Sequence, residues 1–138
     1  MKDSPARLVF HHVGVACADI ESEAARLAPL GYAREADVFT DPRQGVRGVF
    51  LVGQAPRLEL LEPLHGANGG VLAPWLKQEI KLYHLAYETT DLAMSIERLR
   101  GERAKLVVPP IAAVAFGGRA IAFLMLANRM LVELIARE

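Results

Sequence analysis

Residues 11–20 read HHVGVACADI, and residues 83–92 read YHLAYETTDL. In each stretch a histidine, His12 or His84, is followed seven residues later by an aspartate and then by an aliphatic residue. The apolar and small residues after each histidine favour a β-strand, and the aspartate is a good N-cap for a following helix. The two stretches therefore predict the same strand-to-helix unit, used twice.

Further matches extend this repeat over both halves of the chain. Glu59 lies in LELL and Glu133 in VELI, 47 and 49 residues after their respective histidines. Four landmarks of the first half recur at offsets of 70 to 73 residues: Leu27 with Leu99, Gly31 with Gly101, Gly45 with Gly118, and Phe50 with Phe123. This correspondence indicates an internal duplication. We expect a single domain, residues 1–138, made of one module over residues 8–63 and another over residues 80–138.

Periodicity and turn residues place the remaining elements. In the first module we expect a helix from Asp19 to Gly31 and strands over residues 8–16, 46–52 and 57–61. In the second we expect a helix from Asp91 and strands over residues 82–88, 119–126 and 130–135. Residues 63–79 are expected to form a linker with a helical turn, and the residues up to Arg7 a flexible lead-in. Each module thus consists of a strand, a helix and two or three strands.

The composition excludes several classes of function. The chain has 138 residues with 16 basic and 16 acidic side chains, so no net charge attracts it to nucleic acid or to an anionic membrane. No apolar run approaches the roughly 20 residues that cross a bilayer, and the N-terminus lacks the pattern of a secretory signal. The single cysteine, Cys17, fits a reducing compartment. We therefore expect a cytoplasmic protein that binds neither nucleic acid nor membrane.

The repeated histidines and glutamates are candidate metal ligands. Side chains alternate along a strand, so His12 shares a face with the small residues Gly14 and Ala16, while the valines pack on the helix. A lone carboxylate in an apolar strand is costly to bury unless it is paired, protonated or metal-bound. A single buried histidine is more often hydrogen-bonded than metal-bound, but the repetition favours a divalent-metal site of His12, Glu59, His84 and Glu133. His11 could compete, but it aligns with Tyr83.

These donors indicate both the metal and the chemistry. Imidazole nitrogens and carboxylate oxygens suit Mn, Fe, Co, Ni or Zn. Four protein ligands leave two positions open on an octahedral ion, where two oxygens of a substrate can bind. Such an ion stabilises a developing enolate as a Lewis acid.

The pattern resembles the vicinal oxygen chelate superfamily, which includes glyoxalase I, extradiol dioxygenases and bleomycin-resistance proteins. Its motifs HHVGVACADIESE, QGVRGVFL, RLELLEPL and HLAYETTDL are most similar to those of methylmalonyl-CoA epimerases. The resemblance implies an α+β fold of tandem βαβββ modules whose sheet curves around a metal. It also implies that the ligands are His12, Glu59, His84 and Glu133, and that the metal-bound Glu133 is catalytic.

One departure from the epimerases concerns the second proton-transfer group. The epimerases carry a catalytic glutamate just before a Gln/His-Gly-Val turn. Here that turn is Gln44-Gly45-Val46, and the residue before it is Arg43. Arginine stays protonated and is a poor general base, whereas epimerisation needs an acid and a base on opposite faces of the enolate. Asp41 would compensate only if its loop turned inward. Arg43 is instead a candidate to bind a substrate carboxylate or phosphate as a bidentate fork, or it is a solvent-facing loop residue.

Three functions remain open at this point. The resemblance favours a metal-dependent isomerase or lyase that stabilises the enolate of a small acyl or acyl-CoA substrate. A lyase acting on a glutathione hemithioacetal, like glyoxalase I, is the second, and a non-catalytic protein that sequesters a small molecule such as an antibiotic is the third. We also expect a homodimer, because exposed sheet edges can pair with another chain and members of the superfamily commonly form dimers.

Overall fold

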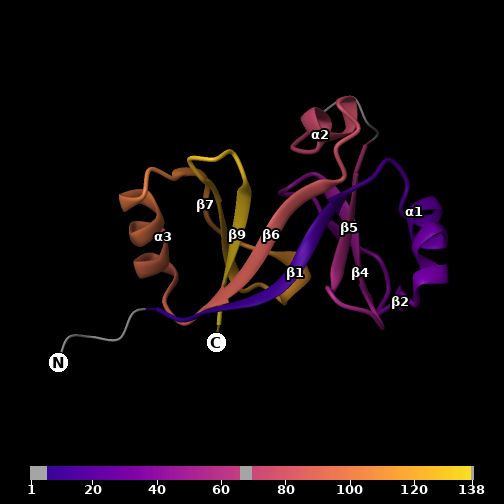
Figure 1. Cartoon of the computed structure of the whole chain (residues 1–138), viewed down its shortest axis with the longest axis horizontal. Coiled ribbons are helices and arrows are strands. Elements are labelled where there is room, and N and C mark those ends of the chain that lie inside the picture. Colours follow the sequence, from indigo (N-terminus) through magenta and orange to yellow (C-terminus); the bar gives the residue numbers. More distant parts are fainter. Residues whose placement is uncertain (1–5, 66–69, 138) are drawn as a thin grey trace. The chain divides into compact units, whose positions relative to one another are not determined.

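The computed structural model describes residues 6–65 and 70–137, which form two compact units. The His12 unit comprises residues 12–83, and the His84 unit comprises residues 84–138 together with residues 1–11. The chain passes between the units twice, inside β1 (Leu8–Ala16) and inside β6 (Leu82–Thr89), directly before His12 and His84 (Figure 1). His12 and His84, the two candidate histidine ligands, are therefore each the first residue of a unit after the chain has passed into it.

The His12 unit contains a mixed sheet, the helix α1 of about two turns and shorter helical segments. After β1 come α1 (Ile20–Leu27), a short 3-10 helix (Ala28–Leu30), β2 (Ala33–Arg34), β3 (Phe39–Asp41), β4 (Val46–Val52), β5 (Leu58–Pro63) and α2 (Ala73–Lys77). The strand order is β2-β4-β5-β1, with β3 also paired to β4. β1 runs parallel to β5, and the other pairs are antiparallel.

The His84 unit repeats this plan. β6 is followed by α3 (Leu92–Gly101), β7 (Lys105–Ala112), a 3-10 turn (Val114–Phe116), β8 (Ala120–Met125) and β9 (Leu131–Ala136). The strand order is β6-β9-β8-β7, in which β6 and β9 are parallel and β9, β8 and β7 are antiparallel. Each unit thus contains strand, helix and further strands in the expected order, and the α+β class is confirmed.

Both long helices begin at the predicted aspartate caps. The carboxylate of Asp19 accepts a hydrogen bond from the backbone N–H of Ser22 at 2.9 Å, and that of Asp91 accepts one from Met94 at 3.0 Å. Each bond satisfies a backbone donor that the first helical turn leaves unpaired. The caps fix where each helix leaves its preceding strand, and hence which face of the sheet the helix covers.

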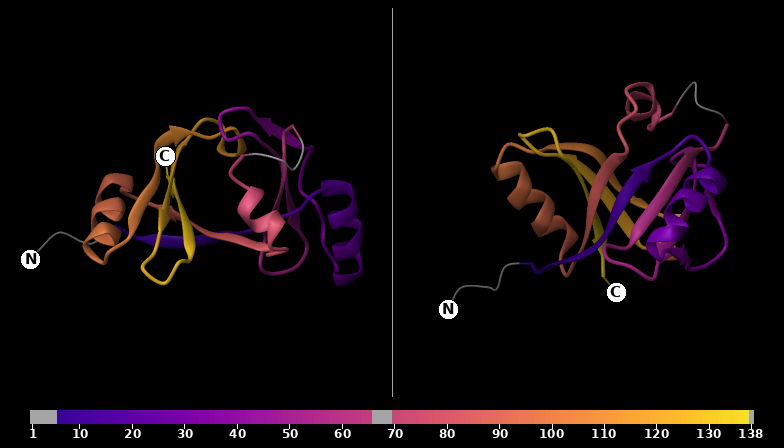
Figure 2. Two further views of the ribbon diagram at one scale, coloured as in Figure 1. Left: turned by 90° about the horizontal axis from the view of Figure 1, so that it is seen from above. Right: turned by 45° about the vertical axis from the view of Figure 1, so that its right-hand side comes forward.

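In each unit the helix and the sheet enclose a separate apolar core, on the sheet face opposite the candidate ligands. In the His12 unit, Ile20 and Ala24 of α1 pack with Val49, Leu51 and Leu60 of the sheet. In the His84 unit the equivalent cluster includes Ile96 and Leu99 of α3 and Ala122, Leu124, Val132 and Leu134 of the sheet. Figure 2 shows α1 and α3 each lying against the strands of its own unit. The expected packing of the valine face of β1 on the helix is confirmed by Val15.

Three expectations differ from the structure. The strand β7 was not predicted, because Pro109 and Pro110 interrupt its pattern; prolines are tolerated at the edge of a sheet, where β7 lies. Gly31 ends the first helical segment in a left-handed conformation, but its predicted counterpart Gly101 is helical, and the left-handed residue there is Arg103. The short strands β2 and β3 were also not predicted individually.

The helical turn expected in the linker is present as α2, whereas residues 66–69 of that linker lie outside the described residues. Residues 1–5 of the expected lead-in also lie outside them. Within residues 6–65 and 70–137, no helix is long and apolar enough to span a membrane.

Candidate functional site

The His12 unit contains a buried histidine–glutamate pair. Nε2 of His12 lies 3.0 Å from Oε1 of Glu59, and the two side chains are 0% and 5% exposed. The ring of Phe50 packs edge-on against the imidazole, with the ring centres 5.1 Å apart. The ring of Phe50 thus provides an apolar contact on one side of the buried pair.

The His84 unit contains a pair of the same kind. Nε2 of His84 lies 3.1 Å from Oε1 of Glu133, and the side chains are 1% and 4% exposed. Phe123 packs edge-on against the imidazole, with the ring centres 5.2 Å apart. Two segments that are far apart in the sequence thus form the same local arrangement.

The strand registers explain why both pairs form. Glu59 lies beside Gly14 in the parallel β1–β5 pair, and Glu133 lies beside Ala86 in the parallel β6–β9 pair. Each of these small residues is two positions after the histidine and shares its face, so the glutamate can reach the imidazole without a steric clash. Phe50 is the antiparallel partner of Glu59, and Phe123 that of Glu133. Histidine, glutamate and phenylalanine therefore come from three adjacent strands in each unit.

The chemistry of these side chains fits a divalent metal. Each pair offers an imidazole nitrogen and a carboxylate oxygen, and the buried His and Glu residues could hold a metal ion. Nitrogen and oxygen donors of this kind suit Mn, Fe, Co, Ni and Zn. Burial of a carboxylate beside an imidazole is costly without a compensating charge, which a cation supplies.

The predicted competitor, His11, has a different environment. It precedes His12 in β1, so its side chain points to the other face of the strand. Its ring contacts Phe116 edge-on, with centres 5.5 Å apart. This ring contact gives His11 a packing role in the His84 unit, and His12 remains the better ligand candidate.

Arg43, the predicted substrate-binding residue, lies exposed in the turn between β3 and β4. The turn is built by the buried carboxylate of Asp41, which accepts hydrogen bonds from the backbone N–H groups of Arg43 and Gln44 at 3.1 and 3.2 Å. The other oxygen of Asp41 accepts one from the side-chain amide of Gln44 at 2.9 Å. Asp41 thus holds the loop in shape and leaves the guanidinium of Arg43 exposed at the tip.

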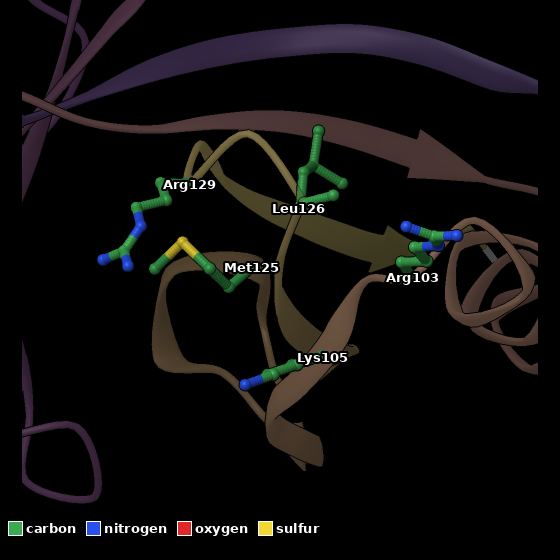
Figure 3. Close-up of a pocket in the computed structure, with 6 residues that line it drawn as sticks. Arg103, Lys105, Met125, Leu126 and Arg129 are labelled. Atoms are coloured by element: carbon green, nitrogen blue, oxygen red, sulfur yellow. The ribbon is translucent and has the colours of Figure 1, made fainter.

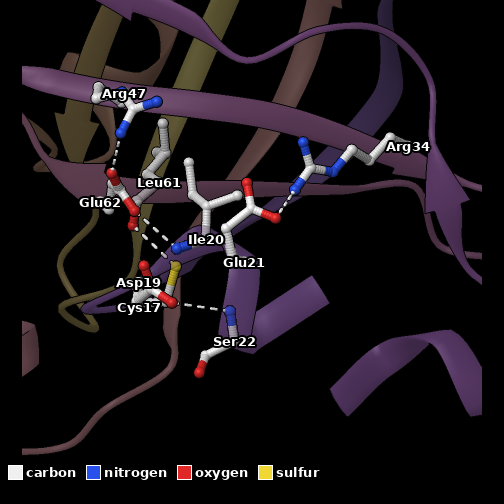
Figure 4. A network of polar contacts seen from close by, with 9 residues as sticks. All are labelled: Cys17, Asp19, Ile20, Glu21, Ser22, Arg34, Arg47, Leu61 and Glu62. Atoms are coloured by element: carbon white, nitrogen blue, oxygen red, sulfur yellow. Dashed lines mark hydrogen bonds and ion pairs between the residues drawn. The ribbon is translucent and has the colours of Figure 1, made fainter. Parts of the chain in front are cut away.

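A further buried carboxylate, Glu62, was not singled out from the sequence. One of its oxygens accepts a hydrogen bond from the backbone N–H of Ile20 at 2.7 Å, and the other lies 2.8 Å from Nη1 of Arg47 (Figure 4). Alternation along LELLEP places Glu62 on the helix face, opposite to Glu59. The alternation in the sequence is therefore enough to separate Glu62 from the candidate ligands, and its contacts show that it stabilises the start of α1.

Arg47, Arg119 and Cys17 have structural roles. Arg47 pairs with Glu62, and Arg119 donates to Glu88 at 3.0 Å and to the carbonyl of Ala136 at 3.2 Å. Burial, followed by the charges of Glu23 and Glu62, raises the pKa of the Cys17 thiol to about 12. A thiol with such a pKa is not a nucleophile at neutral pH.

Comparison with known proteins agrees with this architecture. Residues 11–123 match the family described as the glyoxalase/bleomycin resistance protein/dioxygenase superfamily. An ethylmalonyl-CoA/methylmalonyl-CoA epimerase of Cereibacter sphaeroides is 27% identical over 117 residues, which cover 83% of this chain and 86% of the relative.

Solved structures of epimerases have the same fold. Methylmalonyl-CoA epimerase from Mycobacterium tuberculosis superposes with a TM-score of 0.77 at 25% identity, covering 94% of this chain and 88% of the other. A variant of the Streptomyces coelicolor enzyme in complex with 2-nitronate-propionyl-CoA gives a TM-score of 0.78 at 24% identity, covering 94% and 98%. The predicted glyoxalase-like fold is confirmed, and the chain belongs to the glyoxalase/bleomycin resistance protein/dioxygenase superfamily.

Proposed function

We propose that this protein is a metal-dependent epimerase that moves the α-proton of a small acyl-CoA. The observation that carries the proposal is the duplicated, buried His–Glu pair, present with the same geometry in both units. The similarity to an ethylmalonyl-CoA/methylmalonyl-CoA epimerase supports an acyl-CoA as the substrate.

Both pairs are proposed to serve one ion. A single pair supplies only two protein ligands, whereas metal sites in proteins generally use three or four. The two histidines also follow directly on the two points where the chain crosses between the units. His12, Glu59, His84 and Glu133 would then be the ligand set for Co, Mn, Ni, Zn or Fe.

A divalent ion held by these residues would supply Lewis-acid stabilisation of negative charge on the thioester oxygen. Glu133 is the proposed base, because its carboxylate is buried on an apolar strand, where a base is poorly solvated and a proton transfer is favoured. The ring of Phe123, the strand partner of Glu133, packs against His84 beside it. Arg43 is not proposed as the second proton-transfer group, because arginine is a poor general acid and a poor general base.

Arg43 has a proposed role in binding. Its exposed guanidinium at the tip of the β3–β4 turn can donate two parallel hydrogen bonds to the free carboxylate of a malonyl-type thioester. We expect Arg43→Ala to raise KM for such a substrate about 10-fold or more with little change in kcat, as one charge-assisted contact is lost. Arg26→Ala, which removes an exposed arginine on α1, is the control. Equal KM values for the two variants would contradict the role of Arg43.

The function is tested by metal content and turnover together. Protein purified without chelator should contain one divalent ion per chain and interconvert the epimers of methylmalonyl-CoA. His84→Ala should lose the ion, and Glu133→Gln should lose turnover, while Glu97→Ala, on the exposed face of α3, should change neither. Metal-free protein that cannot be reconstituted would favour a sequestering protein. Turnover of methylglyoxal with glutathione, and not of acyl-CoA, would favour a lyase like glyoxalase I.

Deuterium exchange tests the role of Glu133 more sharply. In D₂O, the wild-type protein should place deuterium on the α-carbon of the substrate. Exchange with retained configuration would mean that one group serves one face only, whereas exchange with inversion requires a second group. Glu133→Gln should abolish both, and persistent exchange in this variant would remove Glu133 from the mechanism.

The cytoplasmic location and the homodimer remain predictions.

A further inference from the structure

A basic pocket lies in the His84 unit, apart from the His–Glu pair. It has a volume of about 430 Å³ and is lined by Arg103, Lys105, Met125, Leu126, Ala127 and Arg129. Three of these six residues are cationic, and none is acidic. Figure 3 shows the side chains of Lys105 and Arg129 on one side of the ribbon with Met125 between them, while Arg103 stands apart.

The cations have no acidic partner among the described residues. The ion pairs of residues 6–65 and 70–137 include neither Arg103, Lys105 nor Arg129, although the same region pairs Arg119 with Glu88. Positive charges that gather without a counter-charge repel one another, and an anion relieves that repulsion. The pocket is therefore suited to a ligand with negative charge.

Arg129 is held in place by a tight turn. Its backbone N–H donates to the carbonyl of Leu126 at 2.9 Å, and that of Leu126 donates to Met130 at 2.9 Å. Arg129 also has a φ of 72°, in the left-handed region that favours glycine. The turn therefore fixes the backbone from which the exposed side chain of Arg129 extends into the pocket.

Two residues that line the pocket, Lys105 and Met125, share a face of the sheet with the candidate ligand Glu133. Lys105 is the partner of Met125, and Met125 that of Leu131, so these three form one row across the sheet. The next row with side chains on the same face contains Phe123 and Glu133. Two residues of strand separate the rows, which is about 7 Å. A substrate with its reactive carbon at Glu133 can thus extend an arm along this face to Lys105 and Arg129.

From this arrangement we propose that Lys105 and Arg129 bind the phosphate groups of the coenzyme A tail of the substrate. This inference rests on the proposed function, because it gives the acyl-CoA a second anchoring point. The pantetheine arm between the thioester and the diphosphate is long enough to cover the separation of the rows. Arginine and lysine are the side chains that bind phosphate through charge-assisted hydrogen bonds.

The test compares methylmalonyl-CoA with the methylmalonyl-pantetheine thioester, which lacks the phosphates together with the adenosine of coenzyme A. In Lys105→Ala/Arg129→Ala, KM for methylmalonyl-CoA should rise about 10- to 100-fold, as two charge-assisted contacts are lost. The kcat should stay within a factor of about 2, and KM for the phosphate-free methylmalonyl-pantetheine thioester should not change. Arg98→Ala, an exposed arginine of α3 outside the pocket, is the matched control. Equal effects on both substrates, or on neither, would overturn the proposal.

Calorimetry separates failure of the pocket from failure of the proposed function. If the wild-type protein turns over no acyl-CoA, it is titrated with coenzyme A and with inorganic phosphate. Coenzyme A binding that the double variant loses would uphold the pocket even without turnover. Absence of coenzyme A binding, or inorganic phosphate binding with equal affinity, would refute it. Circular dichroism and thermal melts establish that the variants are folded.

Discussion

The two units contain the same His–Glu–Phe arrangement but differ in what surrounds it. In the His12 unit, the residue two positions before Phe50 on the same sheet face is Gly48, which lies opposite Leu61 on the neighbouring strand. The ring of Phe39 covers this glycine. In the corresponding row next to Phe123, the His84 unit has Ile121 beside Ile135. The His–Glu pair is thus the same in both units, whereas the apolar side chains around it differ.

The turns before these strands also differ. In the His12 unit, the carboxylate of Asp41 holds the turn and presents Arg43. In the His84 unit, the turn after β7 is closed by backbone hydrogen bonds, from Gly118 to the carbonyl of Ala113 and from Arg119 to that of Phe116. One turn is thus held by the side chain of Asp41 and the other by backbone hydrogen bonds. The two turns therefore present different groups at their surfaces. We infer that metal binding is symmetric and that substrate binding is not.

Removal of one complete pair is the largest test of this symmetry. We expect His12→Ala/Glu59→Ala and His84→Ala/Glu133→Ala each to lower the affinity for Co²⁺ by more than about 100-fold, because two ligands are lost in each case. Titration of the purified proteins with Co²⁺, followed by visible absorption, measures this. Loss of binding in only one of the double variants would mean that a single unit holds the ion.

Gly48→Ala tests the apolar surroundings. A Cβ at this position would lie 2.4 Å from Cζ of Phe39 and 2.9 Å from Cδ2 of Leu61, so both side chains must shift. We expect a loss of about 1–3 kcal/mol in the free energy of unfolding, measured with urea. Gly101→Ala, with no atom within 4 Å of the added Cβ, is the control. Equal stabilities of the two variants would contradict the close packing of Phe39 on Gly48.

Two carboxylates outside the candidate ligand set, Glu62 and Glu88, provide a smaller test. Glu62 both accepts a hydrogen bond from the first turn of α1 and pairs with Arg47, whereas Glu88 pairs with Arg119. Loss of a helix-terminal hydrogen bond costs about 1 kcal/mol, and a partly exposed ion pair is worth about 0–1 kcal/mol. Glu62→Ala should therefore lower the unfolding free energy more than Glu88→Ala does. The reverse order would show that α1 does not depend on Glu62.

The smallest expected effect concerns Cys17. Because burial raises the pKa of its thiol to about 12, the thiolate is scarce below that pH in the folded state. Iodoacetamide at pH 8 should therefore leave the native protein unmodified and label it only after unfolding, as mass spectrometry would detect. Rapid labelling of the folded protein would mean that the core around α1 opens readily.

Much of this protein follows from local patterns in the sequence. Strand β1 begins and ends at the predicted residues, Leu8 and Ala16, and Asp19 and Asp91 cap the helices as expected. These features depend on near neighbours, so alternation and capping chemistry suffice to predict them. The recurrence of histidine and glutamate at equivalent positions also predicts one His–Glu pair in each module, and the structure contains both pairs.

The contacts themselves needed the tertiary structure. Only the parallel registers of β1 with β5 and β6 with β9 bring each glutamate beside a small residue and within reach of its histidine. The role of Glu62 and the gathering of Lys105 with Arg129 likewise depend on strands that meet through long-range pairing. The edge strand β7 could not be predicted from the sequence, because Pro109 and Pro110 interrupt its strand pattern. An edge position tolerates these prolines. The sequence determined which side chains can act, because residue type and spacing are local; the fold decided which of them meet, because register is not.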